Sequence, residues 1–201
     1  MKMLKRLKRI VDMVVSLIVS VTILPFLYVL LGFIIKLDSR GPVIFRQVRT
    51  GLDGKPFVCY KFRSMQLNDR SDTSQASDND PRITRVGKII RKCHIDEIPQ
   101  FYNVLKGDMS IIGPRPHMLA HTKIFSEMTP DYNLRHQVRP GITGLAQVNG
   151  YCGAIKTEPD IRGRLSLDLW YIKHMSPGLD TYIFVKTISS KFRHVSRRRR
   201  N

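Results

Sequence analysis

Two adjacent carboxylates, Asp96 and Glu97, stand in the stretch HIDEIPQFYN at residues 94–103. Paired carboxylates can supply a nucleophile, a general acid or base, or a metal ligand. The stretch is equally typical of a helix start, because Asp is a favoured N-cap, proline is tolerated in a first turn and Glu suits the positive end of the helix dipole. It predicts a helix from Glu97 to about Lys106, with Gly107 just past its end. Taken alone, it favours an N-cap role for Asp96 over a catalytic one.

The chain has 201 residues, enough for one domain with its own core, and it is strongly basic. It carries 34 Lys and Arg against 16 Asp and Glu, a formal net charge of +18. This charge favours anionic partners, namely nucleic acid, an anionic membrane leaflet or phosphorylated substrates. The three cysteines are widely spaced and odd in number, so neither a disulfide framework nor a zinc site is indicated. Such cysteine usage fits a reducing cytoplasm.

A basic flank precedes an apolar run at residues 10–35, which contains one acidic residue, Asp12. The run exceeds the about 20 residues that a spanning helix needs, and it shows no signal-peptide cleavage site. Pro25 lies inside the run, where it removes a backbone hydrogen bond and predicts a helix break. Both flanks are basic, so the positive-inside rule keeps both in the cytoplasm. A helix that enters the membrane, breaks at Pro25 and returns satisfies this rule, but the pattern alone leaves a single kinked span open.

The elements that must position the two carboxylates follow from residue 41 onward. Residues 43–63 alternate in polarity around the turn LDGK and predict a β-hairpin. Residues 66–80 are polar and aperiodic and predict a long loop. Helical spacing of apolar residues predicts helices at about residues 83–95, 117–128, 164–175 and 179–192. The last two helices suit either the core or the membrane interface.

Four blocks of the chain resemble the signature sequences of the bacterial sugar transferases, in the order in which that family carries them. The blocks are KFRSM (61–65), DPRITRVGKIIRK (80–92), IDEIPQFYNVLKGDMSIIGPRP (95–116) and RPGITGLAQVNG (139–150). The resemblance covers nearly the whole chain, including the proline-broken membrane helix. It is to the monotopic phosphoglycosyl transferases, enzymes that start lipid-linked glycan assembly.

The resemblance implies transfer of sugar-1-phosphate from a UDP-sugar to undecaprenyl phosphate, with release of UMP. This is the first membrane step in the assembly of an exopolysaccharide, an O-antigen or a glycoprotein glycan. The resemblance also implies Mg²⁺, with Asp96 as nucleophile and metal ligand and Glu97 as its partner. Three alternative roles are open for Glu97: it orients Asp96, helps to hold the metal, or takes a proton from the acceptor phosphate. A helix N-terminus favours both a capping carboxylate and a phosphate, so the two interpretations of Asp96 are compatible.

Five cations are predicted to surround the phosphates, because Arg and Lys bind phosphate oxygens. They are Lys61, Arg63, Arg91, Arg115 and Arg139. Prolines on both sides of Arg115 predict a rigid backbone there. For each cation the alternative is a solvated charge on a very basic surface.

The expected fold class is α+β. It has a re-entrant membrane anchor over residues 1–36 and a catalytic domain over residues 37–201, which contains the β-hairpin and is mainly helical with interfacial amphipathic helices. The resemblance favours the re-entrant anchor, which places the domain on the cytoplasmic face of the bacterial inner membrane and holds the site at headgroup height on an anionic bilayer. No nucleic acid is expected as a partner, and a homodimer is left open. Longer family members carry an extra N-terminal region, so a minimal form or a catalytic fragment is expected.

Three positions depart from the family pattern. Leu24 stands where members often have serine before the membrane proline, and Leu145 and Tyr151 replace the Trp and final Arg of GITGWAQVNGR. The stretch GPRPHMLAH resembles members that transfer hexose phosphate, which favours glucose or galactose as the sugar.

Rival functions make different predictions. A membrane-bound nucleotide-sugar hydrolase releases UMP without the polyprenol phosphate. A non-catalytic basic module that binds membrane or nucleic acid does not need Asp96, and its binding falls steeply with salt. Direct attack by the acceptor, with Asp96 as base or metal ligand, is a third alternative.

Overall fold

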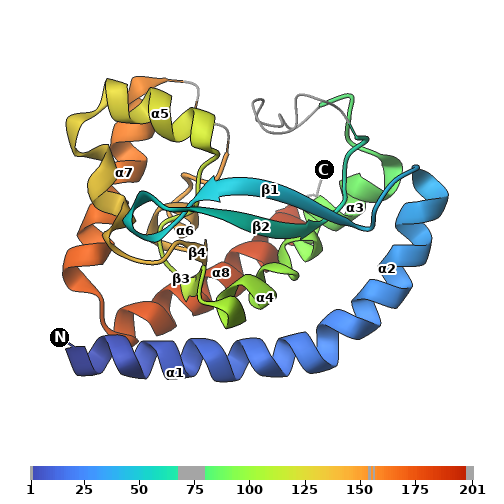
Figure 1. Cartoon of the computed structure of the whole chain (residues 1–201), viewed down its shortest axis with the longest axis horizontal. Helices are drawn as coiled ribbons and strands as arrows, with labels where there is room; N and C mark the ends of the chain where they lie inside the picture. Colours follow the sequence, from blue (N-terminus) through green and yellow to red (C-terminus); the bar gives the residue numbers. More distant parts are fainter. Residues whose placement is uncertain (1, 68–79, 154, 156, 198–201) are drawn as a thin grey trace.

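The structure, a computed structural model, describes residues 2–67, 80–153, 155 and 157–197 (Figure 1). The described residues form an α+β fold that is mostly helical, as the sequence predicts, and they contain two small sheets. The helices are α1 (Lys2–Ile18), α2 (Leu24–Asp38), α3 (Arg85–Lys92), α4 (Gln100–Lys106), α5 (Leu119–Met128), α6 (Leu145–Val148), α7 (Glu158–His174) and α8 (Pro177–Arg197). The strands are β1 (Ile44–Thr50), β2 (Pro56–Phe62), β3 (Ser110–Ile112) and β4 (Gly141–Thr143). Most of the predicted loop at 66–80 lies outside the described residues.

A continuous helical stretch runs from α1 through a π-helical turn, Val19–Ile23, into α2, and Figure 1 shows the bend between the two helices. Pro25 lies in the first turn of α2, where its missing N–H and its ring disturb the regular hydrogen-bond pattern. The Thr22 hydroxyl donates to the carbonyl oxygen of Ile18 at 2.7 Å. Thr22 thus supplies a hydroxyl to the bend although Leu24 occupies the position where family members often have serine.

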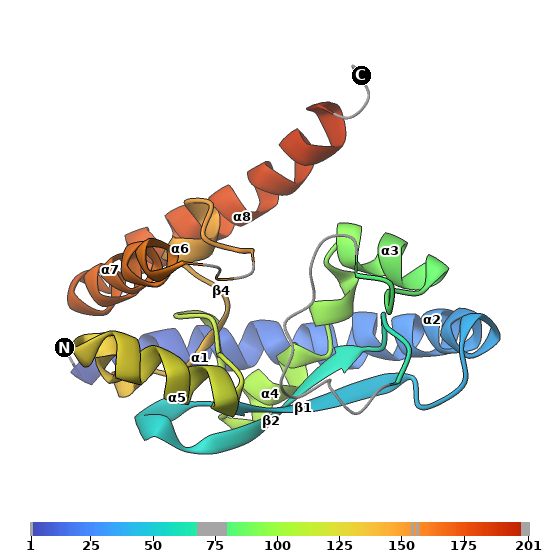
Figure 2. The ribbon, with the colours of Figure 1, turned by 90° about the horizontal axis from the view of Figure 1, so that it is seen from above.

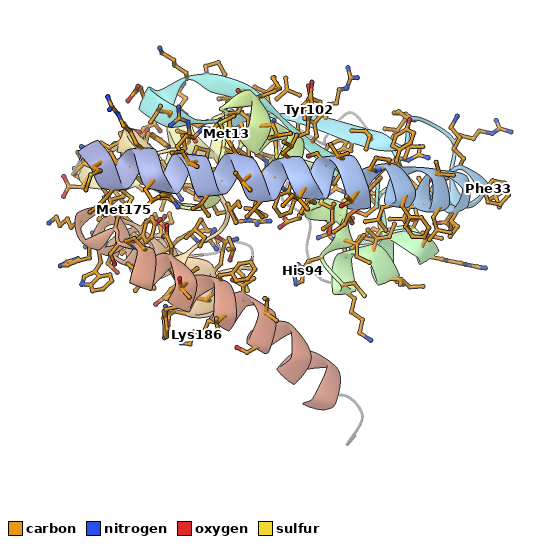
Figure 3. The ribbon with its side chains drawn as sticks, turned by 90° about the horizontal axis from the view of Figure 1, so that it is seen from below. Met13, Phe33, His94, Tyr102, Met175 and Lys186 are labelled. Carbon is orange, nitrogen blue, oxygen red and sulfur yellow. The ribbon has the colours of Figure 1, made fainter. Side chains whose placement is uncertain are left out.

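The apolar helical stretch Met3–Asp38 is long enough to cross a membrane, and little of its apolar window is buried. A core helix of a soluble protein would be mostly buried, so this exposure fits association with a membrane. Figure 3 looks onto the stretch, on which Phe33 is 70% exposed. The structure shows the bend near Pro25, whereas the return of the chain to one membrane face stays a prediction.

One face of α1 is fastened to the rest of the fold by polar contacts. Asp12, the acidic residue in the apolar run, is buried. Its carboxylate accepts hydrogen bonds from the Ser110 hydroxyl at 2.6 Å and from the Ile111 N–H at 3.2 Å. Arg9 donates to the carbonyl oxygen of Leu105, near the end of α4. Specific hydrogen bonds therefore connect α1 to β3 and to α4.

Substitution of Asp12 by leucine makes the apolar run more uniform, yet we expect Asp12→Leu to lower stability by about 1–3 kcal/mol. The reason is that the buried Ile111 N–H is left without an acceptor and the Ser110 hydroxyl loses one of its acceptors. Thermal unfolding of the detergent-solubilised protein measures the loss, and Asp12→Asn, which keeps one acceptor oxygen, is expected to lose less. A Tm for Asp12→Leu at or above that of the wild type would contradict this role.

The predicted hairpin is confirmed, since β1 and β2 pair antiparallel with Gln47 opposite Cys59. The second sheet pairs β3 with β4 in parallel, which the sequence analysis did not predict. Its backbones approach closely next to Gly113, where a Cβ on Gly141 would lie 2.1 Å from the Gly113 nitrogen. Glycine is required there because no other residue leaves room for the neighbouring chain.

The C-terminal helices α7 and α8 lie on one side of α1, and the hairpin lies on the other side (Figure 2). A capping box formed by Thr157 and Asp160 starts α7 earlier than the predicted residue 164. Tyr171 is 1% exposed in the core, whereas Trp170 and Tyr182 are each 48% exposed. One face of α7 thus belongs to the core, while an interfacial role for the outer faces of α7 and α8 stays a prediction.

Candidate active site

Asp96 and Glu97 lie in a 3₁₀ turn, Ile95–Glu97, between α3 and α4. The predicted helix begins only at Gln100, and its N-cap residue is Pro99. The N-cap interpretation of Asp96 is therefore wrong, because the helix starts beyond the proline, whose fixed φ suits the entry to a helix. The helix does end at Gly107 as predicted, with a φ of 94°.

The residue before this turn, His94, has a left-handed backbone with φ 55° and ψ 24°. Few residues other than glycine adopt this conformation. It redirects the chain at the end of α3 into the 3₁₀ turn, in which Asp96 is only 7% exposed. The backbone at His94 thus helps to bring Asp96 into the fold.

We expect His94→Gly to keep nearly the stability of the wild type, because glycine adopts positive φ without strain. We expect His94→Val to lose about 1–2 kcal/mol, since a β-branched side chain is strongly disfavoured in this region. Thermal unfolding of the two variants side by side tests the difference. Equal Tm values would show that the left-handed backbone is not required at this position.

The Asp96 carboxylate is buried, and within the described part of the chain no hydrogen bond or ion pair engages it. Burial raises the pKa of Asp96 above its ordinary value, and the charge of Glu97 acts in the same direction. The cations Lys61, Arg91 and Arg115 oppose the shift. A buried, unpaired carboxylate with a perturbed pKa among three cations is typical of a reactive group rather than a structural one.

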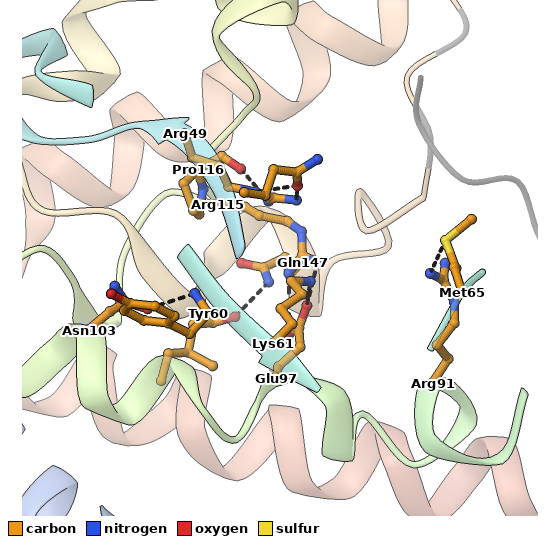
Figure 4. A network of polar contacts seen from close by, with 12 residues as sticks. Arg49, Tyr60, Lys61, Met65, Arg91, Glu97, Asn103, Arg115, Pro116 and Gln147 are labelled. Atoms are coloured by element: carbon orange, nitrogen blue, oxygen red, sulfur yellow. Dashed lines mark hydrogen bonds and ion pairs between the residues drawn. The ribbon is translucent and has the colours of Figure 1, made fainter. Parts of the chain in front are cut away.

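The Glu97 carboxylate, by contrast, is fully engaged, as Figure 4 shows. Lys61 Nζ lies 2.7 Å from Glu97 Oε1, and Arg115 Nη2 lies 2.6 Å from the same oxygen. Burial opposes ionisation of Glu97, but the charges and hydrogen bonds of Arg115 and Lys61 outweigh it and hold the pKa of Glu97 well below its usual range. Glu97 therefore stays ionised, is a weak base, and holds two cations close to Asp96.

Asn103 places Lys61 by joining strand β2 to helix α4. Its side chain is fully buried, accepts from the Tyr60 N–H at 3.0 Å and donates to the Val58 carbonyl at 2.6 Å. Because α4 follows directly after the 3₁₀ turn, this contact fixes β2 relative to Glu97. It thereby sets the short distance between Lys61 and Glu97.

Arg115 is held by backbone contacts on the residues that follow it. Arg49 Nη1 donates to the Pro116 carbonyl at 2.8 Å. The Thr50 N–H donates to the His117 carbonyl at 2.9 Å. Both donors come from the end of β1, so the hairpin supports the rigid segment that the two prolines predict.

Arg91, on α3, is held less firmly by its neighbours than Lys61 and Arg115 are. Its Nη1 contacts the Met65 sulfur at 3.7 Å, and in the described ranges no carboxylate forms an ion pair with it. Its charge lowers the pKa of Asp96. Arg91 is therefore close to the carboxylates and able to bind an anionic ligand.

The other two predicted cations lie elsewhere. Arg63 is 2% exposed and its guanidinium donates to the carbonyl oxygens of Ser39, at 2.7 Å, and of Arg40, just beyond the end of α2. Arg139 donates to the Gly107 carbonyl at 2.8 Å, at the opposite end of α4 from Glu97. Both satisfy carbonyl oxygens that helix ends leave free. Substrate binding by Arg63 and Arg139 stays a prediction that this geometry does not favour.

A magnesium ion needs few protein ligands. No group of three or more His, Cys, Asp or Glu side chains that could hold a metal is found among the described residues. Mg²⁺, however, is commonly bound by one or two carboxylates together with substrate phosphates and water. No described residue occupies the carboxylate oxygens of Asp96, whereas those of Glu97 face Lys61 and Arg115. The donors present therefore fit a magnesium ion shared between Asp96 and a substrate.

A buried polar cluster lies behind Arg115 and was not predicted from the sequence. Arg135 forms an ion pair with Asp168 at 2.7 Å, and both side chains are 2% exposed. In the sequence, Arg135 lies between the predicted helices at 117–128 and 164–175, and Asp168 is one position of the second of them. No local motif joins two residues so far apart in the chain.

A model of the family described as bacterial sugar transferase matches residues 3–194. The chain belongs to this family. The match confirms the family that the four sequence blocks had indicated.

Curated relatives of this sugar transferase differ in length and in the sugar that they are named for. The UDP-glucose:undecaprenyl-phosphate glucose-1-phosphate transferase of Klebsiella pneumoniae is 46% identical over 186 residues, which cover 92% of this chain and 40% of that protein. The UDP-N-acetylgalactosamine-undecaprenyl-phosphate N-acetylgalactosaminephosphotransferase of Aeromonas hydrophila is 46% identical over 90% of this chain and 43% of its own length. The exopolysaccharide production protein PSS of Rhizobium leguminosarum bv. phaseoli is 44% identical over 92% of this chain and 94% of its own length. The chain therefore spans less than half of the Klebsiella and Aeromonas proteins.

Proposed function

We propose that the chain transfers sugar-1-phosphate from a UDP-sugar to undecaprenyl phosphate and releases UMP. The observation that carries this proposal is the buried carboxylate of Asp96, which is unpaired among the described residues and lies beside a Glu97 that holds Lys61 and Arg115. The names of the Klebsiella and Aeromonas relatives, both sugar-phosphate transferases to undecaprenyl phosphate, support it. The glucose-1-phosphate transferase and the N-acetylgalactosaminephosphotransferase are equally identical to this chain, so their names do not decide between the two sugars. The glucose or galactose favoured by the sequence is therefore tested along with other sugars.

In the first step the Asp96 carboxylate attacks the β-phosphorus of the UDP-sugar. The bond between this phosphorus and the bridging oxygen breaks, and UMP leaves with the electron pair. The product is an acyl phosphate on Asp96 that carries the sugar. Burial makes the carboxylate more basic and hence a better nucleophile, while Lys61, Arg91 and Arg115 neutralise the diphosphate.

In the second step a phosphate oxygen of undecaprenyl phosphate attacks the same phosphorus, and Asp96 leaves as a carboxylate. A phosphate monoester is largely doubly ionised near pH 7, so this attack needs no base. Glu97, whose pKa is lowered, is therefore not needed as a base, and its contacts suit the positioning of Lys61 and Arg115. It keeps Lys61 and Arg115 next to the reacting phosphorus.

Mg²⁺ is part of the proposal, held by Asp96 together with the donor diphosphate. When bound, the ion neutralises the diphosphate charge. Arg91 and Arg115 then orient the diphosphate, and their charges favour the ionised form of Asp96.

The finer membrane arrangement is also a proposal. The bend before Pro25, the exposed apolar face and the basic flanks support a re-entrant helix in the bacterial inner membrane, with the catalytic part on the cytoplasmic face. Cysteines introduced at Lys5 and Lys55 in a cysteine-free background can be labelled in intact spheroplasts with an impermeant reagent. Protection of both supports the re-entrant helix, and labelling of one indicates a single span.

The test of the reaction is UMP release across a panel of UDP-sugars in detergent, with and without Mg²⁺ and with and without undecaprenyl phosphate. UMP release from one sugar that depends on both additions supports the transferase and identifies its donor. Continued release of many UMP molecules per protein without the acceptor points to a hydrolase. No release from any sugar would overturn the proposal.

The raised pKa of Asp96 predicts the acid limb of the pH profile. Asp96 must be ionised to attack, so activity falls as the pH drops through a pKa that lies above the ordinary aspartate value. Lys61 lowers the pKa of Asp96, so Lys61→Met is expected to move this limb to higher pH besides reducing the rate. The measurement is kcat/KM for UMP release from about pH 5 to 9. A limb that stays in place or moves to lower pH would contradict the assignment.

A further inference from the structure

A buried chain of contacts connects helix α7 to Arg115. Asp168 on α7 pairs with Arg135, which lies in the 3₁₀ segment Pro130–Gln137. Asp168 Oδ2 lies 2.7 Å from Arg135 Nη2 and 3.1 Å from Nε. The same Nη2 donates to the carbonyl oxygen of Arg115 at 2.8 Å. Asp168 thus fixes the Arg135 guanidinium, and the guanidinium fixes the backbone of Arg115.

Arg135 also reaches the residue two positions beyond Arg115. Its Nη1 lies 3.1 Å from His117 Nδ1, and Arg164 Nη1 lies 3.2 Å from the other ring nitrogen. Burial lowers the pKa of His117 well below its usual range, and the charges of Arg135 and Arg164 act in the same direction. The imidazole is therefore neutral, so it can lie beside two guanidinium groups without adding a third charge. One side chain, Arg135, thus contacts the chain on both sides of Pro116.

The Gly-Pro-Arg-Pro segment depends on such outside contacts. Pro114 and Pro116 have no N–H, so the segment offers carbonyl oxygens but few donors of its own. Arg135 donates to the Arg115 carbonyl and Arg49 to the Pro116 carbonyl. The side chain of Arg115 pairs with Glu97, and its Nη2 lies 2.6 Å from Glu97 Oε1. A shift of the Arg115 backbone would therefore change this ion pair.

We propose that the Arg135–Asp168 pair is a positioning element that sets the rate of sugar-phosphate transfer through Arg115, without touching a substrate. This inference rests on the proposed function. A buried ion pair is seldom retained for stability alone, because well-packed apolar residues often replace it without loss. A positioning role accounts for a pair that is buried, specific in geometry and directed at one backbone carbonyl.

The experiment is a double-mutant cycle on acceptor-dependent UMP release, with Asp168→Asn, Arg115→Ala and the double variant. Asparagine keeps an oxygen that can accept from Arg135 but removes the charge. Asp168→Asn is expected to lower kcat by about 10- to 100-fold, the scale at which a displaced group affects a rate. In the Arg115→Ala background the same change is expected to have less than about a twofold further effect, because the residue through which it acts is gone.

Leu165→Ala is the matched control. Leu165 lies on α7 one turn before Asp168, is 5% exposed, and packs with Phe125, Tyr132 and Ile161. Its truncation lowers the Tm by loss of packing. Well below the Tm it is expected to keep kcat within about twofold, and its effect multiplies with that of Arg115→Ala.

Each outcome has a distinct meaning. Multiplying losses for Asp168→Asn and Arg115→Ala, or a wild-type kcat for Asp168→Asn, would overturn the positioning role. If Asp168→Asn does not fold, Arg135→Lys takes its place in the cycle with the same expectation, because it keeps the charge and loses the second contact. A wild type that releases no UMP overturns the proposed function instead.

Discussion

Asp96→Asn is expected to lower acceptor-dependent UMP release by at least about 10⁴-fold, the scale of losing a covalent nucleophile. The amide cannot form the acyl phosphate, and the Glu97 carboxylate is turned toward Lys61 and Arg115, so it cannot take over. Measurement of kcat for the two proteins with the preferred UDP-sugar gives the ratio.

The same substitution is expected to keep or raise the Tm, which separates the catalytic role from a structural one. Burial raises the pKa of Asp96, so the ionised form is less stable in the folded than in the unfolded chain. The wild type therefore loses stability as the pH rises through the ordinary aspartate range, and Asp96→Asn removes this loss. A structural cap would behave in the opposite way, losing about 0.5–2 kcal/mol when its side chain is removed.

Two outcomes would contradict this assignment. A variant that keeps its full rate means that Asp96 is not the nucleophile. A variant that loses rate and Tm together means that the carboxylate holds the fold through contacts that the described residues do not show.

Arg115→Gln is expected to lower kcat/KM by about 10²–10³-fold, comparable to the loss of an oxyanion-stabilising donor. The variant removes a cation from the diphosphate and leaves Glu97 with Lys61 as its ion-pair partner. Arg115→Lys keeps the charge but not the planar fork, so an intermediate loss is expected.

Arg162→Gln is the control for Arg115→Gln. Arg162 forms an exposed ion pair with Glu158 at 2.6 Å on the surface of α7. Its removal takes away the same charge from the protein without touching the site, so kcat/KM is expected to stay within about twofold. If both arginine variants lose activity equally, net charge rather than the contact with Glu97 determines the rate.

Local patterns in the sequence predicted most of the local structure. The hairpin was recognised because alternating residues flank a turn, and α4 ends at Gly107 because glycine accepts the positive φ of a helix end. The start of α4 was misplaced because Asp96 is followed by a proline that can serve either inside a first turn or as the cap itself. The parallel pairing of β3 with β4 was missed because two three-residue strands leave no recognisable alternation.

The site could be predicted only as far as its motifs are local. Asp96 and Glu97 are neighbours in the chain, and Lys61 and Arg115 were two of the five cations predicted to surround the phosphates. The sequence could not tell these cations from Arg63 and Arg139, since a guanidinium that caps a helix end and one that binds phosphate look alike in a list of residues. The difference lies in which carbonyl oxygens helices leave free once they are packed.

The covalent intermediate on Asp96 is the central claim, and it can be tested directly. The wild type is incubated with its UDP-sugar and Mg²⁺ in the absence of undecaprenyl phosphate, quenched, digested and analysed by mass spectrometry. A covalent mechanism predicts up to one UMP released per protein and a sugar-phosphate adduct on the peptide that contains Asp96, both absent from Asp96→Asn. A wild type that turns over rapidly with the acceptor, yet shows neither UMP nor adduct without it, would contradict the nucleophile and point to direct attack by the acceptor.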